Sequence, residues 1–143
     1  MSESTNEQQN IFINGRQQII DMLQFMNEKE KQKLLSNIKQ RNSLMAKELS
    51  EQSFSFKSLF QLSDESLGKI FKRVNHAIIG LALYPIQIEL QRKALSILDR
   101  EQAEKAYSVM SQDLSNKKAE SKRAQEKIIQ IAIQLSRQNY INL

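Results

Sequence analysis

Residues 23–40, LQFMNEKEKQKLLSNIKQ, contain the pattern that decides the fold. Leu23 and Met26 end a stretch of apolar residues at helical spacing. Asn27 follows, and Glu30 stands three residues further on, which makes an Asn-x-x-Glu capping box. The stretch therefore predicts one helix that ends near Met26 and a second helix that begins after Asn27.

The same arrangement recurs later in the chain. Residues 95–112, LSILDREQAEKAYSVMSQ, can be laid on residues 23–40 without a gap, and Asp99 with Gln102 then takes the place of the capping box. Each copy predicts a helix, a capping residue and a second helix. Helix pairs of this kind stack into armadillo-like solenoids, in which each unit buries its apolar face on a neighbour.

Short capped helices are expected along the rest of the chain as well. Asn42, Ser63 and Asn75 each precede apolar residues at helical spacing and can cap a helix. Pro85 ends the apolar helix that follows Asn75 and can occupy the first turn of the next helix. A long final helix is expected from about Lys118 to Arg137.

Composition supports an all-α fold. The 143 residues include three Gly, one Pro and no Cys, so sheet turns and disulfides have little support. No apolar run reaches the roughly 18–20 residues that cross a bilayer. The first residues are polar and lack the apolar segment of a secretory signal, so residues 1–14 are expected to form a disordered tail.

No pattern of a catalytic, cofactor-binding or metal site is present. The glycines are isolated, which excludes a phosphate-binding glycine loop, and there is no thiol nucleophile. His76 has no nearby carboxylate in the sequence that would orient it as a general base. We therefore expect a protein that is not an enzyme and that takes no cofactor, metal or small-molecule substrate.

Net charge leaves a nucleic-acid interface as a disfavoured alternative. The chain carries a formal charge of +5, but basic and acidic residues alternate along most predicted helices. The densest basic cluster lacks the aromatic residues on which bases stack, and Glu120 and Glu126 interrupt it. Its members are Lys117, Lys118, Lys122, Arg123 and Lys127.

Three aromatic residues lie close together between two helical blocks. Phe54, Phe56 and Phe60 are the only Phe residues in residues 50–65. Large aromatic side chains dominate cores and interfaces, so they either belong to the core or form a hinge or docking segment.

An ordered series of motifs resembles the C-terminal half of the flagellar motor switch protein FliG. That family has a Met-Phe-x-Phe motif where this chain has residues 53–56, Ser-Phe-Ser-Phe, and a Leu-Ala-Leu-Lys-Gly element where it has residues 81–85, Leu-Ala-Leu-Tyr-Pro. The family's final helix has an Ala-Gln-x-x-Ile pattern, which is similar to residues 124–128. Further matching positions are Leu59, Leu62, Asp64, Leu67, Val74, Asn75, Leu135, Asn139 and Ile141. The match covers roughly residues 15–143.

The resemblance implies an all-α, armadillo-like right-handed superhelix of short helices with a C-terminal helical bundle. It divides the chain into an armadillo-like unit at residues 15–52, a hinge at residues 53–62 and a bundle at residues 63–143. Phe54 and Phe56 would be the hinge residues. In the family the bundle faces the stator, and a charged ridge on it transmits torque.

The ridge charges of the family are largely replaced here. The resemblance places its ridge Lys at Tyr84, one ridge Arg at Glu101, and its paired Asp at Ser108 and Val109. Only the last ridge Arg keeps its sign, as Lys117. Electrostatic docking needs charges of defined sign at defined positions, so these changes argue against ordinary torque generation.

Two functional hypotheses follow from the resemblance. In the first, the chain is a FliG-like scaffold at the flagellar motor switch that has lost most torque charges. In the second, it is an authentic switch subunit that generates torque with a rearranged ridge. The candidate charges for that ridge are Glu89, Arg92, Lys93, Arg100, Glu101, Glu104 and Lys117.

A stacking face is expected near the beginning of the chain. The family unit that normally stacks on the armadillo-like unit is not in this sequence, so the apolar face of Ile19, Ile20, Leu23 and Met26 is expected to be uncovered. An uncovered apolar face indicates a helical protein partner, self-association or a swapped element. Flagellar switch or basal-body components are the expected partners, with membrane contact only indirect. The expected location is the cytoplasm, at the cytoplasmic face of the flagellar basal body.

Overall fold

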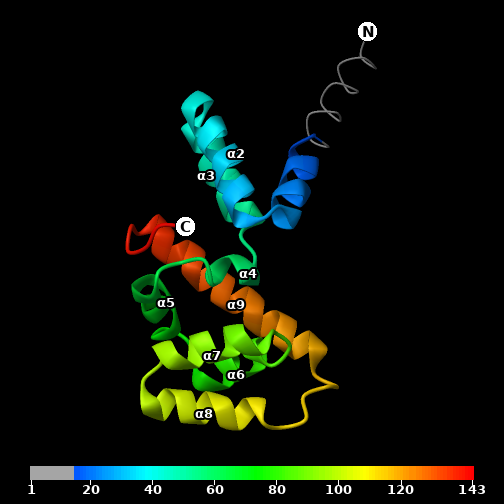
Figure 1. Ribbon diagram of the computed structural model, residues 1–143, viewed down its shortest axis with the longest axis vertical. Helices are drawn as coiled ribbons and strands as arrows, with labels where there is room; N and C mark the ends of the chain where they lie inside the picture. Colours follow the sequence, from blue (N-terminus) through cyan, green and yellow to red (C-terminus); the bar gives the residue numbers. More distant parts are fainter. Residues whose placement is uncertain (1–14) are drawn as a thin grey trace. The chain divides into compact units, whose positions relative to one another are not determined.

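The computed structural model describes residues 15–143, and these residues form helices joined by turns, with no strand among them (Figure 1). This confirms the predicted all-α fold. Residues 15–25 are helical and lead into α2. The further helices are α2 (Glu28–Arg41), α3 (Ser43–Ser53), α4 (Phe56–Leu59), α5 (Asp64–Phe71), α6 (His76–Leu83), α7 (Ile88–Ile97), α8 (Arg100–Met110) and α9 (Lys118–Arg137). The expected disordered tail, residues 1–14, lies outside the described residues.

Short polar side chains set the beginnings of five helices, as the sequence predicts. Each accepts a hydrogen bond from a backbone N–H that has no partner inside the helix. The bonds run to Asn27 from Glu30 N at 2.9 Å, to Asn42 from Met45 N at 3.1 Å, to Ser63 from Ser66 N at 3.2 Å, to Asn75 from Ala77 N at 2.8 Å and to Asp99 from Gln102 N at 2.8 Å.

The structure differs from the prediction at Pro85. This residue does not occupy the first turn of a helix, because α6 ends at Leu83 and α7 begins only at Ile88, with Gln87 as its N-cap. The aromatic segment contains the single-turn helix α4. No helix among residues 15–143 is both long and apolar enough to cross a membrane.

The chain divides into two compact units between Ser55 and Phe56. The first unit contains the helix of residues 15–25, α2 and α3. The second contains α4 to α9. This boundary falls within residues 53–62, the expected hinge, whose role stays a prediction.

The first unit has a small core built from three helices. Ile20, Leu23, Leu35 and Leu49 are buried together. An ion pair of 2.7 Å between Arg16 and Glu48 joins the helix of residues 15–25 to α3. Partly buried side chains border this core, and these are Ile19, Met26, Leu34, Ile38 and Met45.

A lysine is buried in the first unit. The side chain of Lys31 is 4% exposed, and its Nζ donates a hydrogen bond of 3.3 Å to the carbonyl oxygen of Ser53 at the end of α3. Burial lowers the pKa of Lys31 below the usual value of 10.5, and the nearby carboxylate of Glu28 opposes part of this effect. The buried ammonium group thus holds the end of α3 to α2.

The second unit is organised around α6, which packs against both α8 and α9. Ile79, Ala82 and Leu83 of α6 have no exposed surface. The opposing side chains of α9, among them Ile128 and Ala132, are equally buried. A helix covered from two sides explains why residues 76–83 are apolar on most of their circumference.

Glycine allows the close packing of α6 on α8. A Cβ atom at Gly80 would lie 2.6 Å from Cβ of Val109 and 2.8 Å from the carbonyl oxygen of Ala106. Both distances are far shorter than a van der Waals contact. Only a residue without a side chain fits at position 80 while the two helices stay this close.

Glutamine side chains satisfy carbonyl groups at helix ends in the second unit. Gln91 Nε2 lies 2.8 Å from Leu83 O and 3.2 Å from Tyr84 O, at the end of α6. Gln125 Nε2 of α9 donates to Ala82 O at 3.0 Å. These bonds pair carbonyl oxygens that the end of a helix leaves without an intrahelical partner.

We expect Gly80→Ala to destabilise the protein although alanine favours helices. The added methyl group would force α6 and α8 apart, which should lower the free energy of unfolding by about 1–3 kcal/mol. Gly68→Ala is the matched control, since its Cβ would meet only Ile97 Cγ2, at 3.7 Å. That change should raise the free energy of unfolding by about 0.5–1 kcal/mol. Chemical denaturation measures both, and equal effects would contradict the close packing.

Lys31 should make the free energy of unfolding depend on pH in the alkaline range. Its pKa is lower in the folded than in the unfolded state, so the unfolded state binds more protons between these two values. The free energy of unfolding should therefore rise as the pH increases through the folded pKa towards 10.5. Lys31→Met removes this contribution, so the variant should lose stability relative to the wild type as the pH rises. Urea denaturation across alkaline pH measures the difference between the two proteins. The control is Lys33→Met, at an exposed position of the same helix. Its stability relative to the wild type should not fall as the pH rises.

Candidate interaction surfaces

The predicted hinge residues lie in different units and are both buried. Phe54 follows the last residue of α3 in the first unit. Phe56 begins α4 in the second unit and meets Phe60 edge-on, with 5.5 Å between the ring centres. Phe54, Phe56 and Phe60 are all buried, which agrees with the core role that the sequence left open, and the hinge role stays a prediction.

A lysine side chain holds the backbone on each side of this junction. In the first unit, Lys31 donates to Ser53 O at 3.3 Å. In the second unit, Lys93 of α7 donates to Phe60 O at 2.8 Å. Each bond joins the segment near the junction to a helix of its own unit.

The predicted stacking face is mostly covered by the first unit itself. Ile20 and Leu23 are buried against Leu35 and Leu49, not exposed as we expected. Their burial arises because α2 and α3 fold back onto this face. Ile19 and Met26 are only partly buried, so they alone among the four candidates have surface that a partner could contact. Partner binding by the four residues stays a prediction.

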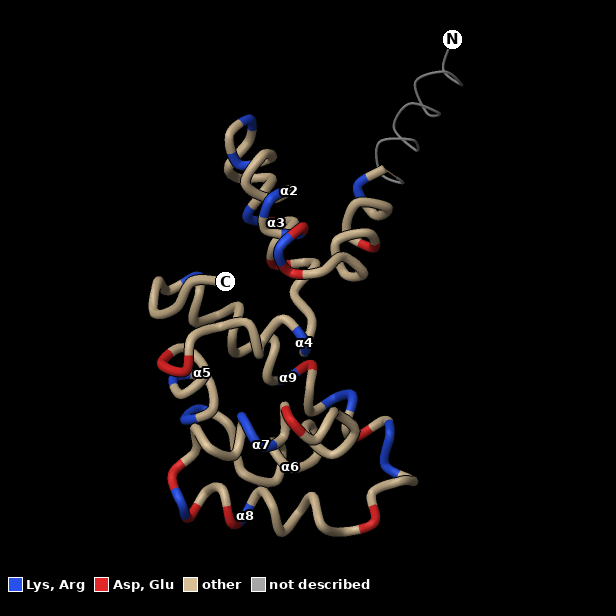
Figure 2. The backbone as a smooth tube through the Cα atoms, in the orientation of Figure 1, with Lys and Arg blue, Asp and Glu red and all other residues tan. Residues whose placement is uncertain are grey.

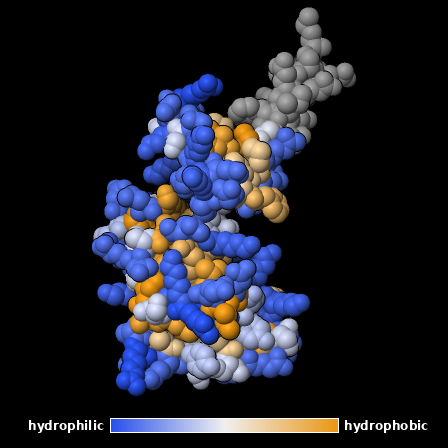
Figure 3. Space-filling model, in the orientation of Figure 1, coloured by the Kyte–Doolittle hydropathy of each residue, from blue (hydrophilic) through white to orange (hydrophobic). Residues whose placement is uncertain are grey.

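The helix of residues 15–25 has an exposed apolar surface beside the predicted stacking face. Phe25 is 90% exposed and Met22 is 49% exposed, and they stand three residues apart on one side of the helix. Figure 3 shows hydrophobic side chains gathered over this part of the first unit. The sequence placed Met22 and Phe25 at the edge of the apolar stripe, but only the fold shows which edge faces solvent.

The charges of α8 pair with one another along the helix. Arg100 Nε lies 3.2 Å from Glu104 Oε1, and Lys105 Nζ lies 3.0 Å from Glu101 Oε1. Figure 2 shows both signs of charge along this helix. Exposed pairs four residues apart contribute only about 0.3–0.5 kcal/mol each, so these charges remain available to a partner. Their opposite signs nevertheless leave little net charge on the helix.

The other ridge candidates differ in exposure and partners. Glu89 and Arg92 are exposed on α7. Lys93 is partly buried and donates a hydrogen bond to Phe60 O, so it has a structural role inside the second unit. Lys117 is exposed and precedes the first turn of α9. The seven candidates therefore do not form one uniform charged ridge.

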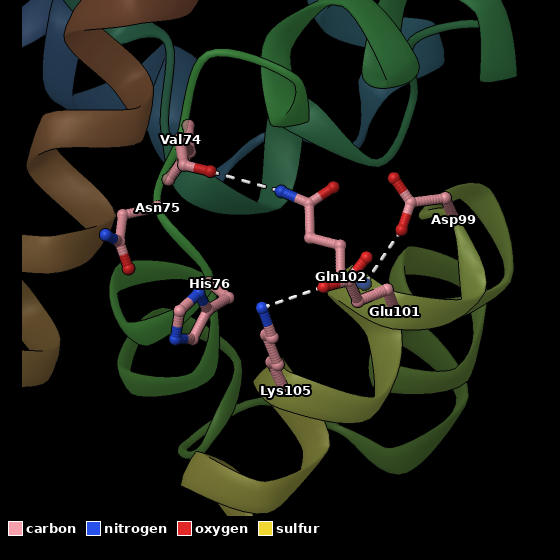
Figure 4. Close-up of a pocket in the computed structure, with 7 residues that line it drawn as sticks. All are labelled: Val74, Asn75, His76, Asp99, Glu101, Gln102 and Lys105. Carbon is pink, nitrogen blue, oxygen red and sulfur yellow. Dashed lines mark hydrogen bonds and ion pairs between the residues drawn. The ribbon is translucent and has the colours of Figure 1, made fainter.

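A polar hollow lies where α6 and α8 begin (Figure 4). Its volume is about 230 Å³, and the residues that line it are Val74, Asn75, His76, Asp99, Glu101, Gln102 and Lys105. The sequence did not predict this hollow, because its walls come from residues far apart along the chain.

Most polar groups of this hollow already have partners. Asn75 and Asp99 accept bonds from the backbone of their own helices, and Glu101 pairs with Lys105. Gln102 Nε2 donates to Val74 O at 3.2 Å. Figure 4 shows no carboxylate joined to His76 that would orient it for proton transfer. No group of three or more His, Cys, Asp or Glu residues within residues 15–143 could hold a metal ion.

Solved structures similar to this chain are FliG structures. A crystal structure of FliG residues 116–343 from H. pylori has a TM-score of 0.68 and 22% identity, and the match covers 87% of this chain and 55% of that one. Full-length FliG from Aquifex aeolicus has a TM-score of 0.55 and 22% identity, with 85% and 38% covered. FliG residues 86–343 from H. pylori have a TM-score of 0.56 and 18% identity, with 100% and 70% covered.

These likenesses establish the fold, which is the armadillo-like helical fold of FliG structures. The chain spans about half the length of the first of these structures. No curated protein sequence matches the chain. A family model for the FliG C-terminal domain matches residues 36–143, which is more than half of the chain and includes helices of both units. The chain therefore belongs to the FliG C-terminal domain family.

Proposed function

We propose that the protein is a non-catalytic interaction module of the flagellar motor switch, located in the cytoplasm at the basal body. The observation that carries this proposal is the family match over residues 36–143. The polar hollow between α6 and α8 supports it, because its polar groups are largely occupied by internal bonds. Its partners would be other helical proteins of the switch or a second copy of the chain.

The partner-binding surface that we propose is the exposed side of the helix at residues 15–25. Phe25 and Met22 offer an apolar contact that a facing helix could cover. Ile19 and Met26 would border that contact, since both keep some exposed surface. Burial of a large aromatic side chain at the centre of an interface supplies much of its binding free energy.

We further propose that the torque charges of the family are largely lost. Val109, which the resemblance places at one of the family's paired Asp positions, packs against Gly80 at the contact between α8 and α6. A carboxylate there would be placed against the backbone of a second helix, where its charge is costly to desolvate. Glu101 pairs with Lys105 of its own helix instead of presenting an unpaired charge.

The hinge is part of the same proposal. The Lys31 and Lys93 bonds hold Ser53 and Phe60 to their own units, and the proposed hinge consists of the residues between these two anchors, where the chain passes from one unit to the other. Hinges commonly consist of a few such residues at the end of an element.

One observation favours the alternative of a torque-generating subunit with a rearranged ridge. Glu89 and Arg92 are exposed on α7, and the structure gives neither an ion pair. Exposed unpaired charges of both signs are what electrostatic docking to a stator requires.

The proposed surface predicts association that depends on Phe25 and Met22. Light scattering across protein concentration should show oligomers, and the double variant Phe25→Ser, Met22→Ser should shift the apparent dissociation constant by at least about tenfold. Leu44→Ser is the matched control, since Leu44 is 67% exposed in the same unit but on another helix. Tagged protein should also retain switch components from its own cells. A wild type that stays monomeric and retains none of them would contradict the proposal.

Deletion and charge exchange separate the scaffold from the torque-generating alternative. Deleting the protein should alter motor behaviour, and normal swimming after deletion would contradict any role in the switch. The exchange Glu89→Lys, Arg92→Glu preserves net charge and should leave rotation speed unchanged in a scaffold. Slower rotation in tethered-cell measurements would instead support a rearranged ridge, provided that the variant keeps the thermal stability of the wild type.

A further inference from the structure

Four basic side chains on the first half of α9 form a charged surface that nothing described above uses. The core side of α9 is fixed by Ala124, Ile128, Ala132 and Leu135, which are buried. Successive residues of a helix are 100° apart, so the opposite side of α9 faces solvent. On this side, all four basic residues are exposed, and together we name them the α9 basic face. They are Lys118, Lys122, Arg123 and Lys127.

Among residues 15–143 these cations form no ion pair, in contrast to those of α8. The ion pairs of the second unit involve Lys69, Arg100 and Lys105, and none involves a residue of the α9 basic face. Glu120 and Glu126 lie nearby on α9 without forming an ion pair to it. Figure 2 shows the blue segments gathered at the beginning of this helix.

One of these cations stands at an unfavourable place in the helix. Lys118 begins the first turn of α9, where the partial positive charge of the helix N-terminus repels a cation, whereas Glu120 in the same turn is attracted. Five other helices relieve this end with a side-chain cap, whereas Lys117 provides none for α9. An anionic partner would compensate the unpaired cations.

We propose that the α9 basic face binds an acidic segment of another protein. Lys118 and Lys122 lie one turn apart on one flank, and Arg123 and Lys127 lie one turn apart on the other, so each flank can meet a row of carboxylates. Glu126 lies between the two flanks and suits a partner that carries some basic residues as well. The proposal concerns α9 and does not depend on the surface at Phe25.

The same surface is poorly suited to nucleic acid or to a membrane. Along α9, which the structure describes completely, no aromatic side chain is available to stack on bases, and two carboxylates would face the phosphates. None of the exposed large apolar residues of the described chain belongs to α9, so the helix has nothing to insert among lipid chains.

The test measures binding of the full chain to three anionic probes at low and at moderate salt. The probes are fluorescent poly-L-glutamate, a 20-base-pair DNA duplex and vesicles that contain phosphatidylserine. The test variant changes all four residues of the α9 basic face to Gln. The matched control changes Lys29, Lys33, Lys39 and Lys47, which are exposed in the first unit, to Gln. Both variants lose four of the five net positive charges, so their net charge is equal.

We expect the wild type and the control to bind poly-L-glutamate within about twofold of each other and the test variant to bind about tenfold more weakly. An equal loss in both variants would show an effect of net charge only and would overturn the proposal. Tighter binding of the duplex or the vesicles than of poly-L-glutamate, lost in the test variant, would assign the surface to another class of partner and would also overturn it. If the wild type binds none of the three probes, the proposal is overturned as well. Thermal melts confirm that the two variants are folded.

Discussion

The second unit depends on the close contact between α6 and α8 at Gly80. Because a Cβ atom at that position would lie 2.6 Å from Cβ of Val109, the two helices can approach only where a glycine stands. α6 packs against α9 as well, so it contacts both charged helices. The exposed charges of α8 are thus positioned by a contact in the apolar interior, on the opposite side of that helix.

The sequence predicted local features well because their causes are local. Capping side chains such as Asn27 and Asp99 bond to a backbone group two or three residues away, so their spacing alone marks the helix starts. The final helix runs over Lys118–Arg137 as expected, and Asn139 after it has a positive φ of 63°, a backbone conformation that commonly ends helices.

Burial in the first unit could not be predicted in the same way, because it depends on how helices fold back on each other. Periodicity identified Ile20 and Leu23 as apolar but could not show that Leu35 and Leu49 cover them. Lys31 looks like any surface lysine in the sequence, and only the return of α3 buries it. The polar hollow between α6 and α8 is a product of tertiary packing for the same reason.

The two lysine–carbonyl bonds, buried at Lys31 and partly buried at Lys93, hold the backbone on each side of the junction between the units. A buried hydrogen bond from an ammonium group to a carbonyl oxygen is costly to break, because both groups would lose a partner away from water. Ser53, which stands where the family has Met, is fully buried, and its hydroxyl donates to Ser50 O at 3.4 Å, so the exchange leaves no unpaired polar group. Ser53 and Phe60 are thereby each held to a helix of their own unit, so the hinge that we propose would bend between these two anchors.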